Sequence, residues 1–199
     1  MTAGNVAYYD YGFSGSLGWG APILITKNAT LVKIARTTTD GLWTLTQTIT
    51  NLPGANPAAK VTMALKNNSS TTKQVFLFRY ADVDPGNAAN EDMPPDGFLE
   101  SFDSSFSAAW GYVPTDGSES GAPSYGLMFQ NSGNLTPSSV SYAREGYSIA
   151  SDQDPLPCNP SANSANAISN TDGGIMYLWV ADNITKNQTI TVNGRYFAF

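Results

Sequence analysis

The amino-acid sequence predicts an all-β protein: an antiparallel β-sandwich, large enough for a supersandwich, with long polar loops. Apolar and polar residues alternate in several short segments, as they do in half-buried strands. Clusters of Gly, Pro, Asn, Asp and Ser separate these segments, and such clusters form turns. No segment of normal helix length has a helical apolar period. A chain of 199 residues suits a single sandwich, so we predict one domain over residues 1–199.

The clearest alternation lies in three consecutive segments, at residues 43–49, 60–66 and 74–80. In the first, Trp43, Leu45 and Ile49 fall on one face and threonines on the other. The second repeats this pattern, whereas the third is apolar on both faces except at Arg79. We therefore predict an antiparallel meander with Trp43 and Ile49 on a buried face and a threonine-coated face in water.

Further strands are predicted before and after this meander. They lie at residues 6–13, 21–26, 30–37, 98–112, 125–129, 140–149, 175–180 and 188–199. Residues 84–97 and 150–174 are predicted to be long polar loops, the second with a short helical turn at 162–168. Loops of this length inside a compact domain are usually functional or mobile.

Two acidic loops form a candidate metal site. Asp82-Val83-Asp84-Pro85 and Asp152-Gln153-Asp154-Pro155 share an Asp-x-Asp-Pro pattern at the end of an apolar strand. Alternate carboxylates and loop carbonyls suit calcium, which takes six to eight oxygen ligands. The candidate ligands are Asp82, Asp84, Asn87, Asp92, Asp96, Asp152 and Asp154. The alternative is that these aspartates only start turns by accepting hydrogen bonds from nearby backbone N–H groups.

Aromatic residues form a second candidate site, because exposed rings stack on the faces of sugars. Trp19, Trp110 and Tyr112 lie beside glycines or in a polar context, and Trp19 is the strongest candidate for exposure. The alternative is that these rings pack in the core of the sandwich. Arg79 interrupts an apolar strand, where it could hold a ligand carboxylate or pair with a nearby aspartate.

Charge and composition limit the partners and the location. The net charge of -6 argues against nucleic acid and anionic lipid, because we expect ten Lys and Arg to be spread thinly. No apolar run reaches the roughly 20 residues of a membrane helix, so no membrane insertion is predicted.

Charged residues make up only 13% of the chain, which suits an extracellular or cell-surface protein. The first residues lack a signal-peptide pattern, so a leader would have been removed.

Missing residue types exclude several chemistries. The chain has no histidine, which rules out a Ser-His-Asp triad and the usual histidine zinc sites. It has one cysteine, Cys158, and no Gly-rich phosphate loop follows a strand, so no nucleotide or organic cofactor is predicted. Two chemistries remain: an elimination that uses Tyr or Arg, and glycoside hydrolysis by paired carboxylates. The carboxylates available for that pair are Asp10, Asp82, Asp84, Glu100 and Asp103.

The segment from Val61 to Asp84, with its Lys66-Asn67-Asn68-Ser69 turn, resembles the repeats of bacterial extracellular β-sandwich modules. It is also similar to sugar-binding sandwiches of the galactose mutarotase type, but the absence of histidine removes the implied mutarotase activity. We therefore predict a secreted or cell-surface module without catalytic residues, which binds glycan or serves as a structural or assembly unit. Its expected partners are glycan or other copies of itself, and calcium is a candidate stabilising ion. The alternative is a carbohydrate-active enzyme, either a glycosidase or a lyase.

Overall fold

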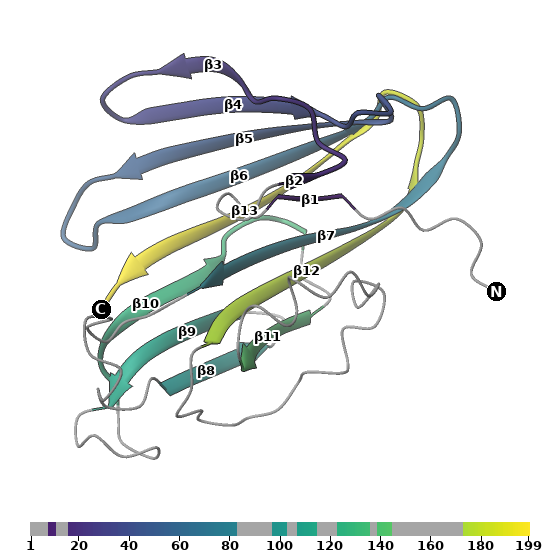
Figure 1. Ribbon diagram of the computed structural model, residues 1–199. Helices are drawn as coiled ribbons and strands as arrows, with labels where there is room; N and C mark the ends of the chain where they lie inside the picture. Colours follow the sequence, from purple (N-terminus) through teal and green to yellow (C-terminus); the bar gives the residue numbers. More distant parts are fainter. Residues whose placement is uncertain are drawn as a thin grey trace.

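The computed structural model describes residues 8–10, 16–82, 97–102, 107–114, 123–135, 139–144 and 173–199. Every regular element in these residues is a β-strand, and the strands form antiparallel sheets, which confirms the predicted all-β sandwich class (Figure 1). None of the described residues belongs to a helix that is long and apolar enough to cross a membrane.

The largest sheet has eight strands. In spatial order they are β3 (Ile23–Lys27), β4 (Leu31–Thr37), β5 (Trp43–Leu52), β6 (Ala58–Asn67), β13 (Thr189–Ala198), β10 (Pro123–Asn131), β9 (Ser107–Pro114) and β8 (Gly97–Phe102). The second sheet contains β11 (Ser139–Arg144), β12 (Gly173–Ile184) and β7 (Lys73–Asp82), in that order. β1 (Tyr9–Asp10) and β2 (Ser16–Leu17) form a short separate pair.

The predicted meander is correct for its first two strands and wrong for the third. β5 and β6 form the expected hairpin, in which Trp43 lies opposite Asn67. β7 does not continue this sheet, because it pairs with β12 in the second sheet. The strand beside β6 is instead β13, from the end of the chain. The chain therefore passes from one sheet to the other directly after β6.

Asn67 holds the chain at this crossing. Its side chain is fully buried, and its amide nitrogen donates to the carbonyl oxygens of Thr71 (2.9 Å) and Ile184 (2.8 Å). Its amide oxygen accepts from both the backbone N–H (2.8 Å) and the hydroxyl (2.7 Å) of Ser69. One side chain thus satisfies buried polar groups at two corners, where β6 leads to β7 and where β12 leads to β13.

The core lies between the two sheets and centres on Phe129 of β10. Its ring meets Tyr177 edge-on at 4.6 Å and Tyr196 at 4.5 Å between ring centroids. The Tyr177 hydroxyl donates to the Phe129 carbonyl oxygen at 2.5 Å, and burial raises the pKa of this tyrosine. Trp179 is completely buried against the same cluster. Trp43, predicted to be in the core, is confirmed there and is 7% exposed.

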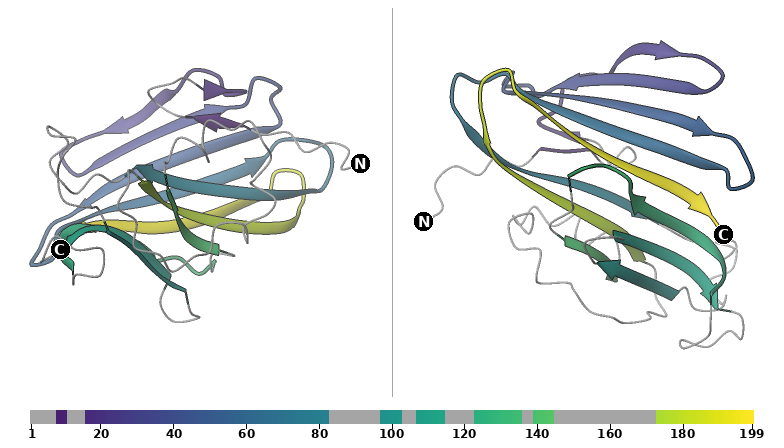
Figure 2. Two further views of the ribbon diagram at one scale, coloured as in Figure 1. Left: turned by 60° about the horizontal axis from the view of Figure 1, so that its bottom comes forward. Right: turned by 180° about the vertical axis from the view of Figure 1, so that it is seen from behind.

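The second sheet covers only one end of the large sheet. Its strands pack on β8, β9, β13 and β6 and on the Trp43 end of β5, whereas β3, β4 and the Ile49 end of β5 extend beyond it (Figures 1 and 2). The prediction that Ile49 is buried is wrong, since its side chain is 40% exposed. Ile49 lies on β5 on the same face as the core, but at a position that the second sheet does not reach. An apolar, partly open surface therefore remains on this part of the inner face.

Candidate functional site: a pocket beside Trp19

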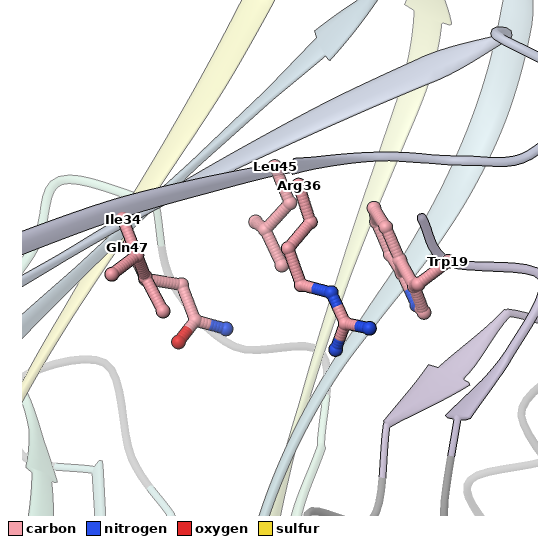
Figure 3. A pocket seen from close by; sticks show the side chains of 5 residues that line it. All are labelled: Trp19, Ile34, Arg36, Leu45 and Gln47. Carbon is pink, nitrogen blue, oxygen red and sulfur yellow. The ribbon is translucent and has the colours of Figure 1, made fainter. Parts of the chain in front are cut away.

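A small pocket of about 50 Å³ lies on the inner face of β4 and β5 (Figure 3). It is lined by Trp19, Ile34, Arg36, Leu45 and Gln47. Four of these residues form two cross-strand pairs, because Ile34 lies opposite Gln47 and Arg36 lies opposite Leu45. Directly opposed residues in a sheet project to the same face, so the register of β4 and β5 brings the arginine and the glutamine together.

Trp19 is positioned by a short segment that runs back along β4. Trp19 itself forms an isolated bridge with Thr38, and the flanking Gly20 N–H donates to the Thr37 carbonyl oxygen at 2.8 Å. Gly18 has a φ of 75°, which favours glycine, and a Cβ there would meet the Tyr8 ring at 2.7 Å. The half-buried Trp19 ring is thereby fixed at one side of the pocket.

The polar groups of the pocket point to the same side of the sheet. The Arg36 Nε donates to the Gly20 carbonyl oxygen at 2.8 Å, which orients the guanidinium beside Trp19. Figure 3 shows the guanidinium of Arg36 and the amide of Gln47 pointing to the same side of the sheet, with the Trp19 ring next to Arg36. Arginine only donates, whereas glutamine both donates and accepts. Such a set can bond hydroxyl groups while the indole ring contacts an apolar face of the same ligand.

The pocket is too small to enclose an organic ligand, because such sites usually have volumes of about 300–1,000 Å³. A ligand would instead lie across its opening. Two exposed apolar residues extend the surface on the same face of the sheet: Leu24, opposite Ile34, is 59% exposed, and Ile49, opposite Val32, is 40% exposed. The site therefore suits a flat or extended ligand better than a compact one.

A group of hydrogen bonds around Asp40, here called the clasp, lies at the Trp19 end of the site; it joins Tyr8, Thr38 and Leu42 to the Asp40 carboxylate. The Tyr8 hydroxyl donates to one Asp40 carboxylate oxygen at 2.5 Å, and the Thr38 hydroxyl (2.6 Å) and Leu42 N–H (3.0 Å) donate to the other. The Tyr8 and Trp19 ring centroids are 6.0 Å apart. Desolvation, then the bond to Asp40, raises the pKa of Tyr8 to about 12. The bonds from Thr38, Tyr8 and Leu42 lower the pKa of Asp40.

These pKa shifts predict how the clasp depends on pH. Asp40 contributes stability above its ordinary pKa of 3.8, and this contribution is lost as the pH falls below it. Tyr8 contributes stability below pH 10.0, which is lost as the pH rises towards 12. Tyr8→Phe should thus lower the free energy of unfolding by up to about 1 kcal/mol at pH 7. Chemical denaturation of both proteins from pH 3 to 11 should show this difference shrinking at both ends, and a constant difference would contradict the clasp.

The other predicted ligand residues lie outside the pocket. Arg79 is between the two sheets, where its Nε donates to the Tyr196 hydroxyl at 2.9 Å and its guanidinium lies 5.4 Å from the centre of that ring. It links the sheets, and no aspartate pairs with it among the described residues. Trp110 is half-buried on the outer face of β9, opposite Met128. Tyr112, predicted to bind ligand, is 1% exposed, so its ring is not available for stacking.

Sequence reasoning selected Trp19 as a candidate but not its pocket neighbours Arg36 and Gln47. A signal for both was present, because each is a polar residue at a core-facing position of its strand. Arg36 follows Val32 and Ile34 on one face of β4, and Gln47 lies between Leu45 and Ile49 on one face of β5. A polar side chain in such a row needs a structural partner or a ligand.

Most of the predicted metal ligands, and part of the predicted catalytic set, lie outside the described residues. Asp82 is the last residue of β7, and the other proposed calcium ligands lie outside the described residues, as do Asp84 and Asp103 of the proposed catalytic set. Residues 8–10, 16–82 and the later described ranges contain no group of three His, Cys, Asp or Glu suited to a metal. Asp10, Asp82 and Glu100 belong to strands of three different sheets. Calcium binding remains a prediction.

The fold and the pocket define an all-β protein of the antiparallel sandwich type with a shallow polar-aromatic site. A scan against models of protein families found no match, and a search of curated proteins found none either. Function therefore has to be argued from the residues of the site.

Proposed function

We propose that this protein is a secreted or cell-surface module that binds glycan without acting on it. The observation that carries this proposal is the grouping of Trp19, Arg36 and Gln47 on one face of the sheet. An aromatic ring, a fixed cationic donor and an amide match the apolar faces and hydroxyl groups of a sugar chain. The exposed apolar residues beside the pocket would extend the contact along that chain.

A binding role is favoured over a glycosidase or lyase because none of the five described residues that line the pocket is an aspartate or a glutamate. Glycoside hydrolysis by paired carboxylates needs two carboxyl groups about 5–10 Å apart across the scissile bond. The described strands that carry the proposed carboxylates lie in separate sheets. Calcium at the acidic loops would stabilise the module and not take part in chemistry.

Replacement of Trp19 by alanine tests this proposal. We expect wild-type protein to be retarded in native gels that contain a soluble polysaccharide such as xylan, glucomannan or polygalacturonate. Trp19→Ala should weaken this binding about 30-fold, since a central aromatic contact contributes about 2 kcal/mol. Tyr125→Ala is the matched control, because Tyr125 is 51% exposed but lies on β10, away from the pocket.

Two outcomes would contradict the proposal: retardation that is equal for wild type and Trp19→Ala, or release of reducing ends from the polysaccharide by the wild type. The gels are run with calcium and with a chelator. A calcium requirement that survives Trp19→Ala would then be assigned to the acidic loops and not to the pocket.

A second candidate function is assembly with other copies through β3. This strand is at the edge of the large sheet, and Ile23, Leu24 and Ile25 are 65%, 59% and 50% exposed. An exposed apolar edge strand is a template for pairing with another strand. The irregular register between Leu24 and Thr26, with Lys27 at the strand end, works against such pairing, which is why we rank assembly second. Light scattering distinguishes a monomer from a β3-paired dimer.

A further inference from the structure

The large sheet has a charge opposite to that of the whole chain. Its eight strands contain six Lys or Arg residues and one acidic residue, Glu100, although the net charge of the protein is -6. The acidic residues are concentrated elsewhere, because thirteen of the sixteen lie between residues 82 and 172. The cations are therefore unevenly distributed along the chain, and the large sheet carries most of them.

Four of these cations project from the outer face, the side of the large sheet that faces away from the second sheet. They are Lys33 of β4, Lys60 and Lys66 of β6, and Arg195 of β13. The register places them on one side, because Lys33 lies level with Thr48 and Thr62 across β5 and β6, and Lys60 lies directly opposite Arg195. Alternate residues of β6, Val61 and Met63, point into the core instead.

This outer face is polar between the cations and is not covered by any described strand (Figure 2). Hydroxyl groups occupy the positions between them: Thr44, Thr46, Thr48 and Thr50 of β5 alternate along the strand. The Thr62 hydroxyl donates to the Asn193 amide oxygen at 2.7 Å, which links β6 to β13. The strands β4, β5, β6 and β13 contain no Asp or Glu, so no carboxylate of these strands neutralises the four cations.

Lys60 and Arg195 are an unfavourable pair. Like charges directly opposite each other in a sheet are destabilising. No ion pair is formed by either residue within the described part of the chain. A like-charge pair on an open sheet face, without a carboxylate beside it, is explained if the face has an anionic partner that supplies the opposite charge.

We infer that the outer face of β4, β5, β6 and β13 binds an acidic polysaccharide. The cations would attract its carboxylate or sulfate groups, and the threonine and asparagine side chains would bond its hydroxyl groups. Lys60 and Lys66 are about 20 Å apart along β6, since an antiparallel strand rises about 3.4 Å per residue. The face therefore spans several sugar units. It lies on the opposite side of the sheet from the Trp19 pocket, so binding at each site can be tested independently of the other.

Other anionic macromolecules fit this face less well. Duplex DNA carries one charge per about 1.7 Å and is bound by proteins with an excess of basic residues, whereas this chain is acidic overall. Attachment to anionic lipid relies on clusters of about four to eight adjacent Lys or Arg, or on an amphipathic helix. Here one Lys–Arg pair and two separate lysines lie among hydroxyl groups on a sheet. A polymer of moderate charge density and many hydroxyl groups matches that spacing.

The test compares two triple variants of the full chain with equal changes in net charge. K33E/K60E/K66E reverses charges on the outer face, and K27E/K73E/K186E reverses the same number elsewhere. Binding is measured on immobilised polygalacturonate and dextran sulfate, with neutral dextran, duplex DNA and phosphatidylserine vesicles in parallel. We expect wild-type protein to bind an acidic polysaccharide, with an affinity that falls as salt rises, and not to bind dextran. The outer-face variant should lose at least about tenfold in affinity, and the control variant far less.

Several results would overturn the inference: equal losses in both variants, tighter binding to DNA or vesicles than to either polysaccharide, or no binding to either. Self-association that depends on the same lysines would assign the face to the acidic segment of a second copy. If K33E/K60E/K66E fails to fold by circular dichroism, K33Q/K60Q/K66Q replaces it with the same expected direction. Trp19→Ala should leave this binding unchanged, which separates a failure of the pocket from a failure of the outer face.

Discussion

Replacement of Asn67 by alanine is expected to lower the free energy of unfolding by about 2–4 kcal/mol, because it removes the side-chain partners of two buried backbone groups. The Ile184 carbonyl oxygen would lose its amide donor and the Ser69 N–H its acceptor, whereas the Ser69 hydroxyl could still donate to the Thr71 carbonyl oxygen at 2.9 Å. These groups lie at the two corners where the chain crosses between the sheets. Urea denaturation followed by tryptophan fluorescence measures the loss.

The neighbouring Asn68 provides the control for this prediction. Its amide also donates two hydrogen bonds, to the Gly41 carbonyl oxygen (3.2 Å) and the Thr44 hydroxyl (2.9 Å), but at a partly exposed position. Water can replace these bonds, so Asn68→Ala should cost less than about 1 kcal/mol. Equal losses for the two alanine variants would show that Asn67 has no special role at the crossing.

Replacement of Gly194 by alanine should destabilise the protein by about 3 kcal/mol, at the upper end of the usual range for overpacking a core. A Cβ at this position of β13 would overlap the Phe129 ring. That ring cannot move freely, because Tyr177 and Tyr196 pack against it at 4.6 and 4.5 Å between centroids. Thermal or urea denaturation measures the loss.

A second substitution separates overlap from other effects of the added methyl group. Phe129→Leu alone should destabilise the core by removing aromatic contacts. Combined with Gly194→Ala it should cost less than the sum of the two single variants, because the smaller side chain leaves room for the methyl group. Strictly additive losses would mean that the close approach of Gly194 and Phe129 does not limit the packing.

Local patterns were enough to predict the all-β class, the β5–β6 hairpin and the burial of Trp43. They were not enough to predict the partner of β7, because alternation along a strand does not specify which strand lies beside it. That choice depends on Asn67, whose bonds join residues more than a hundred positions apart, and on β13 taking the place beside β6. The exposure of Ile49 was missed for the same reason, since the extent of the second sheet is not encoded in β5.

The candidate sites, too, could be inferred only in part from the sequence. Trp19 was a candidate because of its glycine-rich context, but its neighbours Arg36 and Gln47 are brought to it by the register of β4 and β5. The lysines of β6 are visible in the sequence as part of a polar face. Their meeting with Arg195 requires the pairing of β6 with β13, which joins residues 60 and 195. The acidic overall composition therefore did not reveal that four cations lie on the outer face of the large sheet.

The measurement that tests the central claim most directly is a glycan array probed with the wild-type protein at physiological salt. The array carries neutral and acidic polysaccharides, and the same slides are probed with Trp19→Ala and with K33E/K60E/K66E. We expect the wild type to bind a defined subset of glycans, Trp19→Ala to lose signals that depend on the pocket, and the lysine variant to lose acidic ones. A wild-type protein that binds no glycan, or binds the same set as both variants, would contradict the proposal that this sandwich is a glycan-binding module.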